Sequence, residues 1–142
     1  SIRTTIGVAR NVVYKDELGM HVNNCVFCGD QDKVLENTQC FAIYDRFPVS
    51  KGHMLIIPKR HFSSYFDSTK EELMGFNEMI LAAQKELDSI YNPDGYNIGI
   101  NCGEGAGQTV MHTHIHLIPR YTDDVTDPRG GIGGVIPTKK KY

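Results

Sequence analysis

The chain has 142 residues, of which 40% are hydrophobic and 23% charged, and its formal net charge at pH 7 is −2. This length fits one domain, and the composition is that of a globular protein with a core, which excludes a disordered chain. The small negative charge argues against generic nucleic-acid binding, and no apolar run approaches the ~20 residues that a membrane helix needs. We therefore expect neither a nucleic-acid nor a membrane partner. Residues 1–5 show no apolar signal segment.

The first half of the chain predicts short strands. Residues 6–14 are compatible with a strand or a short helix, and residues 39–46 are rich in strand formers. A loop with a proline and a glycine follows at 46–52. Residues 53–57 then form a nearly continuous apolar run closed by Pro58, which predicts a strand covered on both faces.

A long amphipathic helix is the clearest element. Ser68 or Thr69 is a candidate N-cap, with Glu71 or Glu72 three residues later in a capping-box pattern. One apolar stripe follows at spacings of three and four, formed by Leu73, Phe76, Ile80, Ala83, Leu87 and Ile90. The turn-forming residues 92–95 end the helix. We expect this helix to cover a sheet.

Two more strands and a tail complete the chain. Residues 96–101 alternate as a strand, 102–108 form a glycine-rich loop, and 109–118 predict a second strand stopped by Pro119. The tail, 121–142, is rich in glycine and lysine and is expected to lie over the domain or a partner subunit. Strands, one long helix and further strands predict an α+β fold with a mostly antiparallel sheet in a single domain, 1–142.

Three histidines alternate along the last predicted strand. His112, His114 and His116 would project from one face at intervals of about 6.6 Å. A hydrogen-bonded ladder, three ligands of a catalytic zinc, and a neutral imidazole that attacks phosphorus are the possible interpretations. The glycine-rich loop before the strand suits a phosphate, and no acidic residue beside the histidines completes a hydrolytic metal centre. The spacing alone slightly favours a metal, but these surroundings lead us to favour an imidazole of this strand as a nucleophile.

The pair Cys25 and Cys28 has the Cys-x-x-Cys spacing. Alone, this spacing is compatible with a redox pair, two unremarkable thiols, or half of a zinc site. A chain of this size does not need disulfides for stability, so we expect a reducing compartment, the cytoplasm.

Two sequence blocks, 107–120 and 51–61, resemble the histidine triad (HIT) family of nucleotide hydrolases and transferases. The first carries the pattern His-φ-His-φ-His-φ-φ, where φ is apolar, and departs from it at Thr113. The resemblance spans about 25–120 and is nearest to bacterial members. Gln108 followed by Thr109 resembles the branch that hydrolyses dinucleoside polyphosphates.

The resemblance implies a role for each matching residue. His114 matches the nucleophile, which takes the nucleotide as a nucleotidyl-histidine, and the other catalytic positions are His116, His53 and Thr109. His116 and Gln108 match groups that bind the phosphate oxygens, and Asn101 matches another phosphate contact. Asp45 matches the residue that holds the ribose hydroxyls, while Phe27 and Leu55 match an apolar wall for the base. The implied substrate is an adenine-type nucleotide, either a dinucleoside polyphosphate or a nucleoside phosphoramidate, cleaved at its α-phosphate.

Some bacterial family members pair such cysteines with two histidines. The matching set here is Cys25, Cys28, His61 and His112, which implies a closed, structural Zn²⁺ and no catalytic metal. The family also implies a homodimer. The alternatives are a nucleotidyltransferase or phosphorylase, a zinc enzyme that uses the three alternating histidines as ligands, and a nucleotide-binding module without turnover.

Overall fold

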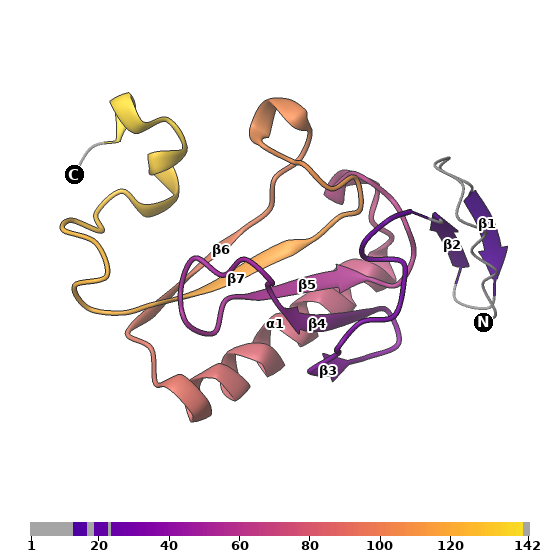
Figure 1. Ribbon diagram of the computed structural model, residues 1–142, viewed down its shortest axis with the longest axis horizontal. Coiled ribbons are helices and arrows are strands. Elements are labelled where there is room, and N and C mark those ends of the chain that lie inside the picture. Colours follow the sequence, from indigo (N-terminus) through magenta and orange to yellow (C-terminus); the bar gives the residue numbers. More distant parts are fainter. Residues whose placement is uncertain (1–12, 17–18, 23, 141–142) are drawn as a thin grey trace.

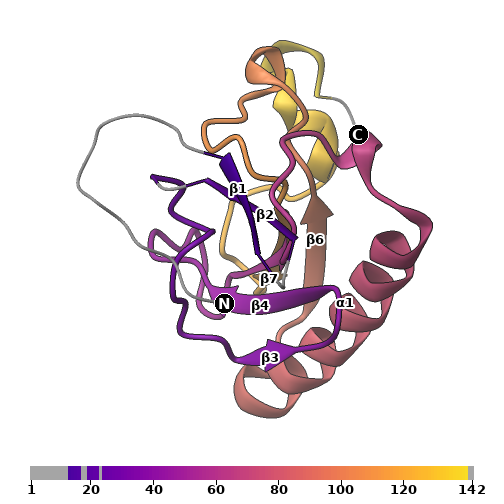
Figure 2. The same cartoon turned by 90° about the vertical axis from the view of Figure 1, so that its right-hand side faces the viewer.

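The computed structural model describes residues 13–16, 19–22 and 24–140 and has the predicted α+β architecture. Its main sheet has five antiparallel strands in the order β3-β4-β5-β7-β6. These are β3 (Leu35–Glu36), β4 (Cys40–Tyr44), β5 (Met54–Pro58), β6 (Gly95–Gly99) and β7 (Ile115–Arg120). Helix α1 (Lys70–Tyr91) covers one face of this sheet (Figures 1 and 2).

Strands β1 (Val13–Asp16) and β2 (Gly19–Val22) form a separate antiparallel pair. Most of the ambiguous segment 6–14 lies outside the described residues, and its last two residues belong to β1. Among the described residues, no helix is both long enough and apolar enough to cross a membrane.

Helix α1 begins as its sequence predicts. Thr69 is the N-cap, and its hydroxyl accepts from the Glu72 N–H while the Glu72 carboxylate accepts from the Thr69 N–H. The buried helix residues Phe76, Met79, Ala83 and Leu87 pack against the sheet residues Ala42, Met54, Ile56, Ile115 and Leu117. This contact between helix and sheet is the main core.

The predicted apolar stripe of α1 is wrong at both of its ends. Leu73 is 39% exposed and Ile90 is 51% exposed. Leu73 lies about 60° around the helix from Phe76, at the margin of the buried face, and Met79 occupies that face instead. Ile90 lies in the last turn of the helix.

The other face of the sheet carries a second, smaller apolar cluster. Phe41, Ile43, Leu55 and Ile57 project to this side, and the loop before β3 lays Phe27 against them. Every residue of β5 is buried, which confirms the prediction of a strand covered on both faces. Because α1 occupies the opposite side, this second face is available for a site.

The last strand begins later than predicted. Strand β7 starts at Ile115 and not at Thr109, so His112 and His114 precede it and only His116 lies within it. Before the strand, the chain turns toward the segment that follows β5, where the Thr113 N–H donates to the Phe62 carbonyl at 2.7 Å. This detour brings His112 next to His61.

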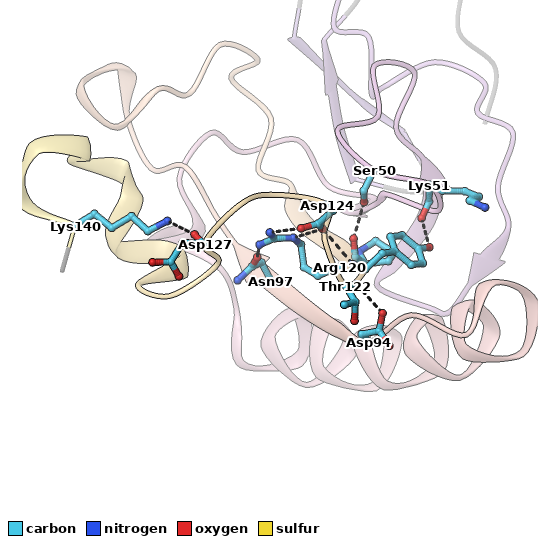
Figure 3. A network of polar contacts seen from close by, with 11 residues as sticks. Ser50, Lys51, Asp94, Asn97, Arg120, Thr122, Asp124, Asp127 and Lys140 are labelled. Atoms are coloured by element: carbon cyan, nitrogen blue, oxygen red, sulfur yellow. Dashed lines mark hydrogen bonds and ion pairs between the residues drawn. The ribbon is translucent and has the colours of Figure 1, made fainter. Parts of the chain in front are cut away.

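The chain after β7 is anchored by polar contacts at the end of the sheet (Figure 3). Arg120 donates to Asn97 at 2.6 Å and to Asp124 at 2.7 Å, and the Tyr121 hydroxyl donates to the Lys51 carbonyl at 2.6 Å. The tail then forms two short 3-10 helices, η3 (Gly131–Val135) and η4 (Pro137–Lys139). Its first helix lies beside β6 of the same chain.

Candidate active site and metal cluster

A row of side chains across three strands forms the floor of the site. Ile43 on β4 pairs with Leu55 on β5, and Leu55 pairs with His116 on β7. Neighbouring strands lie about 4.8 Å apart, so about 10 Å separates Ile43 from His116. Asp45 and His53 extend the β4–β5 pairing by one step, since the Asp45 N–H donates to the His53 carbonyl at 2.9 Å.

A cavity of about 540 Å³ lies over this floor. It brings together most of the residues that the sequence proposed for catalysis and nucleotide binding. Those that line it are Phe27, Asp45, His53, Leu55, Asn101, Thr109, His114 and His116. The cavity is also lined by Asp30, Gln31 and Arg46, which sequence reasoning missed because isolated polar loop residues carry no motif.

The hydrogen bond of His114 fixes which of its ring nitrogens carries the proton. His114 Nδ1 lies 2.8 Å from the carbonyl oxygen of His112. A carbonyl can only accept, so Nδ1 is the donor and Nε2 keeps its lone pair when the ring is neutral. The ring is 9% exposed, lines the cavity and contacts Phe27 edge-on at 5.1 Å between centroids. An uncharged nitrogen with a free lone pair is a competent nucleophile.

His53 and His116 form a chain of hydrogen bonds next to it. The Val49 N–H donates to His53 Nδ1 at 3.1 Å, so the proton of His53 is on Nε2, which donates to His116 Nδ1 at 2.9 Å. In the neutral state the remaining His116 nitrogen, Nε2, is therefore a donor. Burial, with the nearby His114 and His53, lowers the pKa of His116 to about 4, and burial also lowers the pKa of His53.

Gln108 lies outside the cavity lining and is 4% exposed. Its amide group donates to the Ser63 and Val110 carbonyls, and its side-chain oxygen accepts from the Gly103 N–H. In this structure Gln108 braces the glycine-rich loop, and a direct contact with phosphate would require it to release these bonds. The N–H groups of residues 106, 107 and 108 also bond within the loop. The loop therefore offers fewer donors than its glycine content predicts.

The second cluster contains the four predicted metal ligands. His112 Nδ1 lies 3.1 Å from His61 Nδ1, 3.4 Å from Cys25 Sγ and 3.5 Å from Cys28 Sγ. Ligands of a tetrahedral zinc with bonds of about 2.0–2.3 Å lie about 3.3–3.7 Å apart, so these four atoms fit such an ion. His112 Nε2 donates to the Pro58 carbonyl at 2.8 Å, which turns the lone pair of Nδ1 toward the cluster.

The charges in this cluster also suit a cation. A hydrogen bond from Cys28, together with the adjacent His112, lowers the pKa of Cys25 to about 3. Burial lowers the pKa of His61, which favours its neutral form. A thiolate and neutral imidazoles are the forms that bind zinc.

A partly buried ion pair that the sequence did not reveal holds the His61 segment in place. Arg60 donates to the Glu72 carboxylate at 2.8 and 3.1 Å and stacks over the Phe62 ring at 4.1 Å. Glu72 is 3% exposed and also belongs to the capping box of α1. The start of α1 is therefore tied directly to the segment that carries His61.

A second group of possible metal ligands lies inside the cavity itself. The donor atoms of Asp45, His53 and His116 lie within 4.8 Å of one another. Two of the nitrogens already share a hydrogen bond, however, and His53 Nε2 carries the proton of that bond. A metal here would have to displace this proton, whereas in the Cys/His cluster the Nδ1 lone pair of His112 points toward the other three ligands.

Comparison with known proteins matches residues 29–123 to the HIT domain. An uncharacterised HIT-like protein of 16.1 kDa from Mycoplasma pneumoniae is 39% identical over 105 residues, covering 70% of this chain and 73% of that protein. A bis(5'-adenosyl)-triphosphatase from Dictyostelium discoideum is 43% identical over 87 residues, covering 59% of this chain and 56% of that protein. The crystal structure of a zinc-bound histidine triad protein from Mycobacterium smegmatis superposes with a TM-score of 0.66 at 32% identity, covering 73% of this chain and 80% of that one. With residues 29–123 matching the HIT domain, and with His114 and His116 lining a nucleotide-sized cavity, this chain belongs to the histidine triad family.

Proposed function

We propose that the protein is a nucleotide hydrolase that cleaves phosphoanhydride or phosphoramidate bonds at the α-phosphate of a purine nucleotide. The observation that carries the proposal is the bond between His114 Nδ1 and the His112 carbonyl, which leaves a free lone pair on Nε2 inside the cavity. Adenine nucleotides are the first substrates to test, because a relative is named as a bis(5'-adenosyl)-triphosphatase.

In the first step, His114 Nε2 attacks the α-phosphorus. A P–N bond forms, the bond from phosphorus to the leaving group breaks, and the leaving group departs with that electron pair; a phosphoramidate nitrogen also takes a proton from solvent and leaves as an amine. His116, as a neutral donor on Nε2, and the cavity residues Thr109 and Asn101 meet the charge on the phosphoryl oxygens. The low pKa of His116 favours this neutral form at pH 7.

In the second step, water attacks the same phosphorus. The P–N bond breaks, its electron pair returns to His114 Nε2, and the nucleoside monophosphate leaves with the oxygen of the water. The Asp45 carboxylate lines the cavity 3.5 Å from His53 Nε2, and in this proposal it accepts hydrogen bonds from the ribose hydroxyls. Phe27 and Leu55 supply apolar walls for the base.

We also propose that the Cys/His cluster holds a structural Zn²⁺. The ion would join the loop of Cys25 and Cys28 to the segments of His61 and His112. His112 lies two residues before the nucleophile. The same loop carries Phe27, so the metal would position a wall of the cavity without contacting substrate. Cysteine ligands require reduced thiols, so the proposal includes a reducing compartment, the cytoplasm.

The test incubates zinc-loaded protein with diadenosine triphosphate and, separately, with adenosine phosphoramidate. The wild type is expected to release AMP and to form an acid-labile nucleotidyl-histidine that rapid quenching traps. His114→Gly should lose several orders of magnitude in kcat, and added imidazole should restore part of the rate. Thr113→Val, next to the nucleophile but buried and outside the cavity lining, is the matched control and should retain the wild-type rate.

The same experiment separates the alternatives. A transferase would pass the nucleotide to phosphate or another acceptor faster than to water. A binding module would bind AMP and convert neither substrate. A zinc enzyme that uses Asp45, His53 and His116 as ligands would lose turnover at once on chelation and trap no nucleotidyl-histidine. Undiminished turnover by His114→Gly without imidazole contradicts the proposed mechanism.

We further propose a homodimer. Strand β6 forms an edge of the sheet, and its residue Ile98 is 48% exposed. Val135 and Ile136 of the tail are also exposed, at 74% and 55%. Exposed apolar groups at an unpaired strand edge suit pairing with a second copy. Light scattering should give twice the chain mass, and Ile98→Glu should shift the protein to monomer.

A further inference from the structure

The end of the cavity that lies away from His114 carries polar side chains that the proposed chemistry does not use. A second cavity of about 510 Å³ adjoins the first, and the two share Asp30, Gln31, Ile43 and Arg46. These shared residues therefore mark the boundary of the nucleotide cavity. Ile43 is about 10 Å from His116 across the sheet, which is about the distance from the α-phosphate to the base of a nucleotide.

The side chains at this boundary differ in how many of their donors and acceptors are already used. Both donors of the Gln31 amide are used, by the carbonyls of Val26 at 2.7 Å and Gly29 at 3.3 Å. Only the side-chain oxygen of Gln31 remains for a ligand. The Asp30 carboxylate has no hydrogen bond or ion pair within residues 24–140. Two residues with acceptor oxygens that have no partner within residues 24–140 thus line this boundary.

Arg46 supplies the complementary group. It follows Asp45 directly, lines both cavities, and its guanidinium has no partner within residues 24–140. It is the only lysine or arginine among the described residues that line the nucleotide cavity. The base would therefore meet a carboxylate and a guanidinium on its edge, between the apolar surfaces of Phe27 and Leu55.

We infer that Asp30 makes the site prefer guanine to adenine; this inference rests on the proposed function and extends it to the base. Guanine presents two adjacent donors, N1–H and the N2 amino group, to one carboxylate, and its O6 accepts from a guanidinium. Adenine offers Asp30 only the N6 amino group, and its N1 is an acceptor. Asp30 is thus a specificity-determining residue, and Arg46 supports the same orientation of the base.

The experiment measures binding of GMP, IMP and AMP to the zinc-loaded full chain by calorimetry. GMP should bind about tenfold more tightly than AMP, because one additional charged hydrogen bond at an open site contributes about 1.4 kcal/mol. IMP retains N1–H and O6 but lacks the N2 amino group, so its affinity should lie between the two. Asp30→Asn should reduce the ratio of GMP to AMP affinity to about two.

Asp32→Asn is the matched control. Asp32 is an exposed aspartate of the same loop and lines only the second cavity, so its replacement should leave the ratio at about ten. Equal or tighter binding of AMP by the wild type, or an unchanged ratio in Asp30→Asn, overturns the inference and leaves the hydrolase proposal intact. If no purine nucleotide binds and no substrate is cleaved, it is the proposed function that fails.

Discussion

Two histidine clusters meet at the segment 112–116: the metal cluster of Cys25, Cys28, His61 and His112, and the cavity cluster of His53, His114 and His116. They differ in where the ring protons lie. In the metal cluster, His112 Nε2 donates a hydrogen bond to the Pro58 carbonyl, and Nδ1 faces Cys25, Cys28 and His61. In the cavity, His114 Nδ1 donates a hydrogen bond to the His112 carbonyl, and the lone pair of Nε2 is left for substrate. Two residues of the same type, two positions apart, thus present opposite nitrogens to opposite partners.

The comparison indicates that backbone carbonyls determine which ring nitrogen of each histidine can bind a metal or attack a substrate. A carbonyl that accepts from one nitrogen leaves the lone pair on the other, and the direction of that lone pair decides between a metal and a phosphorus atom. If this is correct, changes in the metal cluster should act mainly on stability, whereas changes in the cavity should act mainly on turnover.

Loss of the metal should have the largest effect on stability. Chelation of zinc from the wild type is expected to lower Tm by on the order of 10–20 °C, because a metal that binds only the folded chain contributes several kcal/mol. His112→Ala should have the same Tm as the chelated wild type, and added zinc should not raise that Tm. His114→Ala should keep both the wild-type Tm and its response to chelator. Scanning calorimetry with and without chelator measures these Tm values. An equal loss of Tm in both variants would contradict the separate roles of the two clusters.

Glu72→Ala should have the next largest effect at neutral pH. It leaves the partly exposed Arg60 without its partner and removes half of the capping box, so we expect a loss of about 2–3 kcal/mol in the free energy of unfolding. Urea denaturation measures this loss, and Glu71→Ala, in the same helical turn but exposed, should change it by less than about 0.5 kcal/mol. Since Arg60 precedes His61, zinc affinity should also fall. A loss below about 1 kcal/mol would contradict the structural role of the pair.

His116 of the cavity cluster should make the free energy of unfolding depend on pH. The folded-state pKa of His116 is lowered from 6.5 to about 4, so between these values the unfolded chain binds more protons than the folded one. The His116 contribution is therefore complete above pH 6.5 and is lost as the pH falls toward 4. The loss amounts to about 3 kcal/mol.

His116→Asn isolates this contribution. The wild type and the variant are compared by urea denaturation at several pH values and at one zinc concentration, so that protonation of the metal ligands affects both proteins alike. The difference in unfolding free energy between them should change by about 3 kcal/mol between pH 6.5 and 4. A constant difference would show that His116 is not held neutral.

The sequence predicted best what is decided locally. The capping box at Thr69 and Glu72 depends on residues three apart, and the core strand β5 depends on a continuous apolar run. The start of β7 could not be predicted, because the Thr113 N–H bonds to Phe62, some fifty residues earlier in the chain. Gln108 illustrates the same limit within the site, since its partners Ser63 and Gly103 become visible only in the folded chain.

Thr113 departs from the family pattern, and its replacement should have the smallest effect on stability. Its hydroxyl is the one buried side-chain polar atom that has no hydrogen-bond partner in the part of the chain that the structure describes. Thr113→Val keeps the shape and removes the unsatisfied group, so the free energy of unfolding should rise by about 1–2 kcal/mol. The rings of His112 and His114 keep their backbone partners, so metal content and kcat should not change.

The same substitution at Thr69 provides the control with the opposite sign. The Thr69 hydroxyl accepts from the Glu72 N–H at 3.1 Å, so Thr69→Val should destabilise the protein by about 1 kcal/mol. Urea denaturation of both variants compares one chemical change in two environments. If Thr113→Val also destabilised the protein, the hydroxyl would have a partner, such as a buried water between the two clusters. Thr113 would then link the metal cluster to the nucleophile, and the two clusters would not be independent.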